Sequence, residues 1–237
     1  MQKVISNQLV NYEVSGSGKQ NLIILHGWGG NLTEWLPVAK ILETRYKIWL
    51  LDFPGMGGSP KPPDSWGIYD YAKFVEDFIK SEKLKDITII GHSFGGRVAI
   101  ILGARSQELV SRLILVDAAG LRIKSLMANL FAIFAPLGRL FPQTIKNLFG
   151  SSDYRTAGNM RKIFVNVIRD DLRSEMFKIK IPTLIIWGEK DITLPLIQAK
   201  VIKEAISGSI LRIVWGAKHW PHLEKPDDFM AIIDEVL

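Results

Sequence analysis

Residues 86–99 read DITIIGHSFGGRVA, and this stretch decides the fold of the chain. The apolar run 87–90 ends abruptly, and a helical pattern begins directly after Ser93, which predicts a buried strand, a one-residue turn and a helix. Gly91 and Gly95 would be needed at that corner because the strand and the helix pack too closely for a Cβ atom. Ser93 would lie at a helix N-terminus, where unpaired N–H groups favour a developing oxyanion. The alternative is a glycine-rich turn that carries an incidental serine.

The composition is that of an ordinary globular protein. The chain has 237 residues, of which 47% are hydrophobic and 23% charged, enough for one domain or a domain with a small insertion. It contains no cysteine, which excludes disulfides, thiolate metal sites and a cysteine nucleophile. The N-terminus lacks the apolar core of a signal peptide, and the longest apolar run, 126–137, is shorter than the roughly 20 residues that span a bilayer. We therefore expect a soluble, cytoplasmic protein.

The net charge of +6 comes from one segment. Residues 121–180 carry 11 Lys/Arg against four Asp/Glu. No zinc-finger spacing or aromatic-basic pattern accompanies this excess, so we expect no nucleic-acid partner. The segment could attract anionic substrates or an acidic membrane surface, but a solvated basic face is the favoured interpretation. The sequence leaves a monomer and a homodimer open.

Strands and helices alternate along most of the chain. The expected strands are a hairpin over residues 3–14 and single strands at 22–25, 46–51, 87–90, 113–116, 181–187 and 210–215, with helices at 33–43, 69–83 and from 226 onward. This alternation predicts a doubly wound, mostly parallel eight-stranded sheet whose strands end at one common edge, where active sites gather. The pattern breaks over 121–178, where short apolar helices are interrupted by prolines. We expect an inserted helical lid there, between core segments 1–120 and 179–237.

The glycine-rich turns do not fit a nucleotide cofactor. The turn at 27–29 would need a third glycine where Leu32 stands, and the turn at 55–57 would need one where Pro60 stands. A faint phosphate-loop match ends at Gln20, where serine or threonine is required. We predict no cofactor and no metal.

Three groups that together suit nucleophilic catalysis stand at three expected strand ends. They are Ser93, Asp191 and His219, in the order nucleophile, acid, histidine that one hydrolase architecture shows. With the motifs around them, the chain resembles the α/β-hydrolase superfamily nearly from end to end. The matching segments are 26–30 (HGWGG), 52–59 (DFPGMGGS), 91–96 (GHSFGG), 187–191 (WGEKD) and 218–226 (KHWPHLEKP). The one departure is Lys218, where this superfamily usually has glycine.

Chemistry and the resemblance together imply a role for each group. Ser93 would attack a carbonyl carbon, His219 would take and return its proton, and Asp191 would fix the imidazole tautomer. By resemblance, the backbone N–H groups of Phe94 and Trp28 would form the oxyanion hole.

Several nearby residues have alternative interpretations. Asp117 also ends an expected strand and could supply the acid, although Asp191 is favoured. Arg97 is more readily a structural anchor than a substrate ligand. His26, His92 and Asp52 are expected to brace loops. His222 could be mistaken for the base, but we expect it to brace its loop near Glu224.

The sequence therefore predicts a serine hydrolase of a small-molecule carboxylic ester. The main rival is a carbon–carbon bond hydrolase of the meta-cleavage type, and thioesterase and amidase activities share the same nucleophile. A catalytically silent ligand-binding relative is the alternative from another class, because the fold does not fix function.

Overall fold

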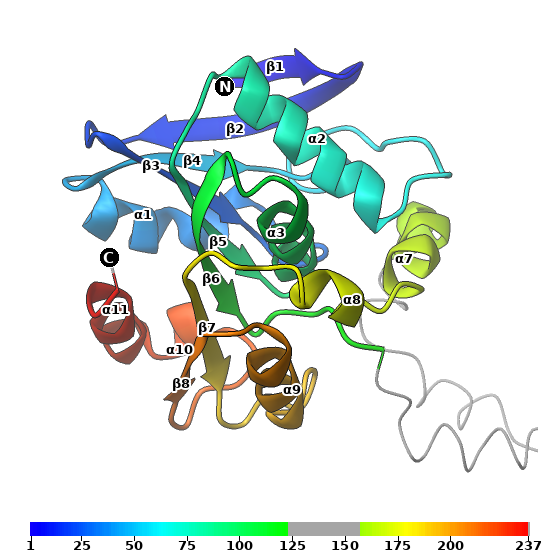
Figure 1. Ribbon diagram of the computed structural model, residues 1–237. Helices are drawn as coiled ribbons and strands as arrows, with labels where there is room; N and C mark the ends of the chain where they lie inside the picture. Colours follow the sequence, from blue (N-terminus) through cyan, green and yellow to red (C-terminus); the bar gives the residue numbers. More distant parts are fainter. Residues whose placement is uncertain (123–156, 237) are drawn as a thin grey trace, which may run out of the picture.

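An eight-stranded sheet forms the centre of the computed structural model, which describes residues 1–122 and 157–236 (Figure 1). The strand order is β1-β2-β4-β3-β5-β6-β7-β8. The strands are β1 (Gln2–Ile5), β2 (Gln8–Ser15), β3 (Gln20–Leu25), β4 (Tyr46–Leu51), β5 (Ile87–His92), β6 (Val110–Val116), β7 (Thr183–Gly188) and β8 (Ile210–Val214). Only the pairings of β2 with β1 and β4 are antiparallel, which confirms the predicted mostly parallel sheet.

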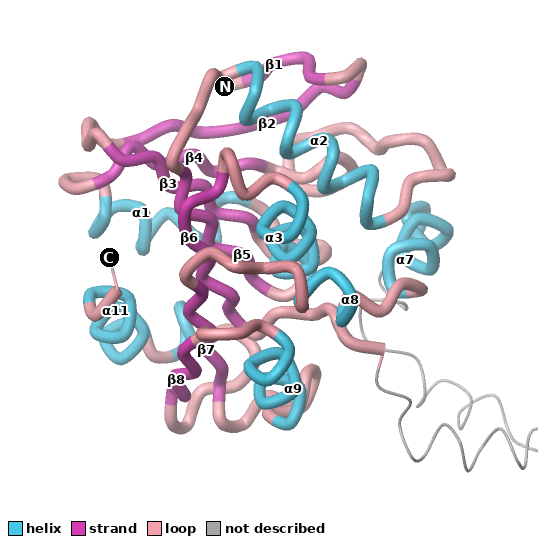
Figure 2. The backbone as a smooth tube through the Cα atoms, viewed as in Figure 1, coloured by secondary structure: helices cyan, strands magenta, loops and turns pink. Residues whose placement is uncertain are grey.

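Helices cover both faces of the sheet (Figures 1 and 2). On one face lie α1 (Leu36–Leu42) with the preceding 3₁₀ turn η1 (Leu32–Trp35), α10 (Pro221–Glu224) and α11 (Pro226–Asp234). The other face carries α2 (Ile68–Ser81), α3 (Phe94–Arg105) and α9 (Ile197–Ala205). The helices α7 (Arg161–Ile168), which follows the 3₁₀ turn η3 (Gly158–Met160), and α8 (Arg173–Met176) contact α2 and α3, respectively.

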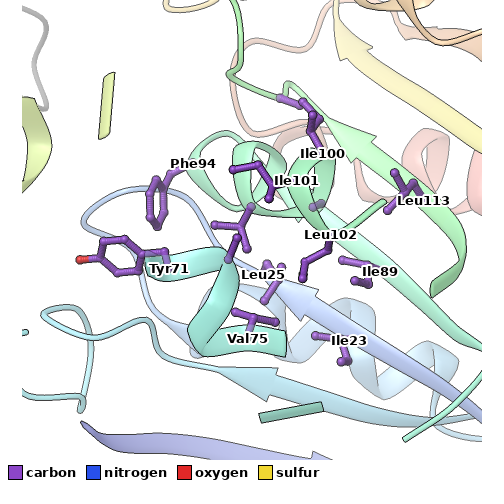
Figure 3. Close-up of a cluster of buried hydrophobic side chains, with 14 of the residues drawn as sticks. Ile23, Leu25, Tyr71, Val75, Ile89, Phe94, Ile100, Ile101, Leu102 and Leu113 are labelled. Carbon is purple, nitrogen blue, oxygen red and sulfur yellow. The ribbon is translucent and has the colours of Figure 1, made fainter. Parts of the chain in front are cut away.

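The two faces of the sheet belong to two separate hydrophobic clusters. Successive side chains of a strand point to opposite faces, and in β3 both sets are buried. Ile23 and Leu25 pack with α2 and α3, whereas the neighbouring Leu22 and Ile24 pack with α1 and α11. Figure 3 shows the first cluster, in which Tyr71 and Val75 of α2 and Phe94 and Ile101 of α3 surround the side chains of β3 and β5. A strand that is buried on both faces needs a continuous run of apolar residues, and residues 22–25 (LIIL) provide it.

The corner after β5 has the geometry that the sequence predicts. Ser93 lies between β5 and α3 with φ +50° and ψ −109°, a strained conformation for a residue with a Cβ. A Cβ on Gly95 would lie 2.2 Å from the carbonyl oxygen of Leu25, and one on Gly91 would lie 2.6 Å from that of Gly95. The need for glycine at both positions is thereby confirmed.

Two features differ from the sequence expectation or lie beyond it. Helix α9 is not predicted from the sequence, because it is short and buries the polar side chain of Gln198 beside Ala199 and Ile202. Of the expected lid at 121–178, residues 157–178 include α7 and α8, and residues 123–156 lie outside the described part of the chain. None of the helices in the described residues is both long and apolar enough to cross a bilayer.

The close approach at Gly95 predicts a large loss of stability for Gly95→Ala. The added methyl group meets backbone that cannot turn away, so we expect the free energy of unfolding to fall by about 3 kcal/mol in urea titrations. The matched control is Gly67→Ala, because a Cβ there has no heavy atom nearer than 3.9 Å. We expect that control to lose less than about 1 kcal/mol. Equal losses in the two variants would contradict the packing argument.

Candidate active site

The register of the sheet brings several chain segments to one edge. Leu25 pairs with Gly91, His92 with Val116, and Val116 with Ile186, so β3, β5, β6 and β7 end close together. Ser93 follows β5 and Asp117 follows β6. Asp191 lies in the turn after β7, and His219 lies in the loop after β8.

Ser93, His219 and Asp191 form a continuous chain of hydrogen bonds. The His219 Nδ1 atom lies 2.7 Å from Asp191 Oδ2, and its Nε2 atom lies 3.1 Å from Ser93 Oγ. Since a carboxylate can only accept, Nδ1 carries the proton and donates it to Asp191. The lone pair of Nε2 is then directed at the Ser93 hydroxyl, which is the tautomer that a base requires. The His219 side chain is 8% exposed and that of Asp191 is fully buried.

Asp191 is held as an anion by several donors. Its Oδ1 atom accepts hydrogen bonds from the N–H groups of Thr193 at 2.7 Å and Leu194 at 2.9 Å. Burial alone would raise the pKa of Asp191, but the hydrogen bonds from His219 and Leu194 outweigh it and hold that pKa below its ordinary value. Asp191 is therefore ionised at neutral pH and can stabilise a positive charge on His219.

The two expected oxyanion donors lie beside the serine. Among the described residues, neither the Trp28 N–H nor the Phe94 N–H has a hydrogen-bond acceptor. The Phe94 N–H opens helix α3, where the helix dipole favours negative charge. The rings of Trp28 and Phe94 meet edge to face, with centroids 5.3 Å apart. Neither N–H group is thus taken up by another acceptor in the described chain.

Two cavities meet at Ser93. One, of about 180 Å³, is mainly apolar and is walled by Phe94, Phe164, Val167 and Leu194. The other, of about 170 Å³, is more polar and is lined by Gly27, Gly29, Gly30, Glu34, His92, His219 and Trp220. Trp28, Ser93 and Thr193 line both, so a substrate bound across Ser93 would place a different part in each cavity. Glu34 was not singled out from the sequence, because it lies within an ordinary helical stretch without a motif.

Arg97 borders the apolar cavity but acts as an anchor. Its side chain is buried, and Nη2 donates to the backbone carbonyls of Val167, at 2.9 Å, and Asp170. These bonds tie α3 to α7 and to the loop that follows. Burial lowers the pKa of the Arg97 guanidinium to about 10, so it stays charged at neutral pH. The structure agrees with the anchor interpretation.

His26 and Asp52 brace loops, as expected. The His26 Nε2 atom accepts a hydrogen bond from the Phe53 N–H at 3.1 Å. The Asp52 carboxylate accepts from the N–H groups of Leu32 and Gly58, both at 2.7 Å. Neither side chain is hydrogen-bonded to Ser93, His219 or Asp191 in the described residues.

Asp117, the alternative acid, is not bonded to His219. It is fully buried, and its Oδ1 atom accepts a hydrogen bond from the Gly188 N–H at 3.0 Å. Burial, and then the neighbouring Asp191 charge, raise the pKa of Asp117 to about 10 despite that bond. In the structure Asp191, and not Asp117, is the carboxylate that binds His219.

The same residues are the one group in the described chain that gathers potential metal ligands. Ligand atoms of Asp117, Asp191 and His219 lie within 4.8 Å of one another. The Asp191–His219 pair, however, is separated by 2.7 Å, whereas two ligands on a tetrahedral zinc ion with bonds of about 2.1 Å lie roughly 3.4 Å apart. The proton between these two atoms accounts for their distance, and the pair is too close for two ligands of a tetrahedral zinc ion.

Comparison with known proteins agrees with this geometry. The family model described as the alpha/beta hydrolase fold matches residues 20–134. Monoacylglycerol lipase ABHD6 of Mus musculus is 28% identical, over 92% of this chain and 76% of that protein. The pimeloyl-[acyl-carrier protein] methyl ester esterase of Wigglesworthia glossinidia brevipalpis is also 28% identical, over 94% of this chain and 95% of that protein.

Solved structures share the whole architecture. A membrane phospholipase A, described as a bacterial virulence factor, superposes with a TM-score of 0.81 at 26% identity, over 100% of this chain and 86% of that one. The chain has the α/β-hydrolase fold. A meta-cleavage product hydrolase superposes with a TM-score of 0.78, over 99% of this chain and 96% of that one. At 23% identity, this last likeness shows a common fold alone.

Lys218 is accommodated by this α/β-hydrolase without backbone strain. Its φ is not positive, so the turn does not require the glycine that is usual in the superfamily. The Lys218 N–H donates to Glu224 at 2.8 Å, and its carbonyl oxygen lies against Gly188, where a Cβ would approach to 1.9 Å. The glycine needed for the close contact between these two loops is thus at position 188.

His222 braces the hydrolase differently from the sequence expectation. Its ring stacks on Trp35 of η1, with centroids 3.9 Å apart and planes 7° from parallel. Neither ring nitrogen has a hydrogen-bond partner in the described part of the chain, and Glu224 instead accepts from the Lys218 N–H. His222 thus braces its loop through the Trp35 ring and not through a hydrogen bond to Glu224. The bracing is hydrophobic, and burial lowers the pKa of His222 to about 3.

This burial predicts an acid sensitivity of folding. A histidine whose pKa is lowered in the folded state stabilises the fold above the unfolded pKa of about 6.5, and that contribution is lost as the pH falls. His222→Phe keeps a ring on Trp35 but carries no nitrogen to protonate. Between pH 5.5 and 4, we expect the variant's free energy of unfolding to fall less steeply than that of the wild type, by about 1.4 kcal/mol per pH unit, in urea titrations. Equal slopes would show that His222 is not held neutral.

Proposed function

We propose that this α/β-hydrolase is a serine hydrolase of carboxylic esters that works through an acyl-enzyme on Ser93. The observation that carries the proposal is the Asp191–His219–Ser93 chain, with its bonds of 2.7 and 3.1 Å at the meeting point of two cavities. That the chain of bonds is complete argues against a catalytically silent relative.

The first half of the reaction forms the acyl-enzyme. The Ser93 Oγ atom attacks the ester carbonyl carbon while His219 Nε2 takes the hydroxyl proton. The resulting imidazolium is stabilised by Asp191. The negative charge on the carbonyl oxygen is bound by the N–H groups of Trp28 and Phe94, and losing one such donor typically costs about 3 kcal/mol of transition-state stabilisation. The ester C–O bond then breaks, and His219 returns the proton to the leaving alcohol.

The second half reverses these roles with water. His219 takes a proton from a water molecule, whose oxygen attacks the acyl carbon. The tetrahedral intermediate collapses, the bond to Ser93 Oγ breaks, and His219 returns the proton to Ser93. A carboxylic acid leaves the site.

The cavities suggest how the substrate lies. The apolar cavity beside Phe164, Val167 and Leu194 suits the acyl chain, and the cavity beside Glu34 and Trp220 suits a polar alcohol. Phe164 and Val167 belong to α7, within the segment 121–178 that we propose as a lid over the core formed by 1–120 and 179–237. The ester-hydrolase names of the 28%-identical relatives favour an ester over the carbon–carbon bond of the rival activity.

A parallel assay separates the candidate reactions. The purified protein would be given p-nitrophenyl esters of increasing acyl length, a thioester, an amide and a vinylogous 1,5-diketone. We expect ester hydrolysis to give the largest kcat/KM, and labelling by a fluorophosphonate probe to map to Ser93. Preferential cleavage of the diketone would replace the proposal with carbon–carbon hydrolysis. A folded protein that neither labels nor turns over would support the ligand-binding alternative.

The nucleophile is tested by Ser93→Ala. One oxygen is removed from a tightly packed corner, so we expect thermal unfolding to be nearly unchanged while kcat falls by a factor of about 10⁴ or more. Turnover above about a thousandth of the wild-type value would rule out the serine mechanism.

Two neighbouring histidines provide a matched pair for the base. His219→Ala should lower kcat by several orders of magnitude, because the only group bonded to both Ser93 and Asp191 in the described residues is removed. His222→Ala removes the ring stacked on Trp35 and should lower thermal stability while kcat falls by about tenfold or less. If the His222 variant were the inactive one, the assignment of the base would be wrong.

A further inference from the structure

The reaction above makes no use of Asp117, although this carboxyl group lies within the site. Asp117 follows β6 with φ +39°, an uncommon backbone conformation for a residue with a Cβ. Its N–H donates to the Ile186 carbonyl, and its Oδ1 atom accepts from the Gly188 N–H, both at 3.0 Å. Residues of β7 therefore hold Asp117 both by its backbone and by its side chain, and the residue is fully buried.

The second oxygen of Asp117 is the unexplained atom. Oδ2 is buried and has no conventional donor among the described residues. The Asp117 carboxyl group is also close to Asp191, since one ligand atom from each of Asp117, Asp191 and His219 lies within 4.8 Å of the other two. Two ionised carboxylates facing each other without solvent would repel strongly. Two neighbouring carboxyl groups can share a hydrogen bond only if one of them carries a proton.

The surroundings decide which of the two carries it. Asp191 receives hydrogen bonds from His219, Thr193 and Leu194, all of which stabilise its anion. Asp117 receives one, from Gly188. The charged groups that act most on Asp117 are the acidic side chains of Asp191 and of Glu224 in α10, and both favour its protonated form. The proton therefore belongs on Asp117.

We propose that Asp117 is a neutral carboxylic acid whose O–H donates a hydrogen bond to Asp191 and fixes the carboxylate that orients His219. Asp117 is then a positioning residue, which touches neither Ser93 nor the substrate. The catalytic consequence rests on the proposed serine mechanism, whereas the protonation state of Asp117 does not. Two neighbouring carboxyl groups kept in different protonation states by unequal environments are a known device of enzyme sites.

The discriminating variants are Asp117→Asn and Asp117→Leu. The asparagine amide can still donate to Asp191 and accept from Gly188, so we expect its kcat to stay within about threefold of wild type. Leucine has a similar size but no donor, and should lower kcat at least tenfold with little change in KM. A loss of tenfold or more in Asp117→Asn would show that a negative charge is needed at this position and would overturn the proposal. Full activity in Asp117→Leu would overturn it too.

Two further measurements do not depend on turnover. An infrared difference spectrum between wild type and Asp117→Asn at pH 8 should contain the C=O stretch of a protonated carboxylic acid. The downfield proton resonance of His219 Nδ1–H should persist in Asp117→Asn and shift or vanish in Asp117→Leu. If the wild type hydrolyses no ester and resists the fluorophosphonate probe, the proposed function fails while these spectra still decide the state of Asp117. A carboxylate signal alone at pH 8, or an unmoved resonance in Asp117→Leu, would refute the proposal.

Stability gives a third readout, which also serves if Asp117→Leu fails to fold. A carboxyl group whose pKa is raised to about 10 in the folded state holds a proton that the unfolded chain releases above about pH 4. The contribution of Asp117 to the free energy of unfolding should therefore decrease as the pH rises from 4 towards 10. Asp117→Asn has no proton to lose there and should not show this decrease. We expect the melting temperature of the variant, relative to that of the wild type, to rise steadily between pH 5 and 9. A constant difference would mean that Asp117 is ionised in the fold.

Discussion

The contact between helix α3 and strand β3 is the constraint on which the rest of the site depends. Gly95 leaves no room for a Cβ above the Leu25 carbonyl, so α3 starts almost on top of the sheet. The chain has one residue in which to change from strand to helix, and Ser93 takes the strained conformation that this requires. The two hydrophobic clusters bury β3 and β5 from both faces of the sheet, and this packing holds Ser93 in its strained conformation. The hydroxyl of Ser93 is consequently held clear of its own backbone.

The sequence predicts best what is local along the chain. The apolar runs of the strands, the glycines around Ser93 and the Asp191 turn are each set by neighbours a few residues away, and the structure has them where the patterns indicate. The eight-stranded sheet follows from these runs because parallel strands with helical connections have few arrangements open to them.

The missed features arise from pairs of residues far apart in the sequence. His222 stacks on Trp35, 187 positions earlier, and nothing near His222 indicates an aromatic partner in η1. The side chain of Asp117 depends on Gly188 and Asp191, which reach it only because β7 pairs with β6. Glu34 enters the polar cavity through the fold of the 27–30 loop and not through a motif. Helix α9 does not stand out in the sequence because it is short and buries the polar side chain of Gln198.

Burial shapes the electrostatics of the sheet edge in two opposing directions. It lowers the pKa values of His26, His92 and His222, so these rings stay neutral, and their contribution to stability is lost as the pH falls below about 6.5. Burial raises the pKa of Asp117, and the corresponding stability is lost as the pH rises above about 4. The histidines make the fold less stable in acid, and Asp117 makes it less stable in alkali. Together these groups therefore favour the folded state most at intermediate pH. Within that range three donors keep Asp191 ionised, so a proton gained by His219 has a carboxylate counter-charge hydrogen-bonded to the same ring.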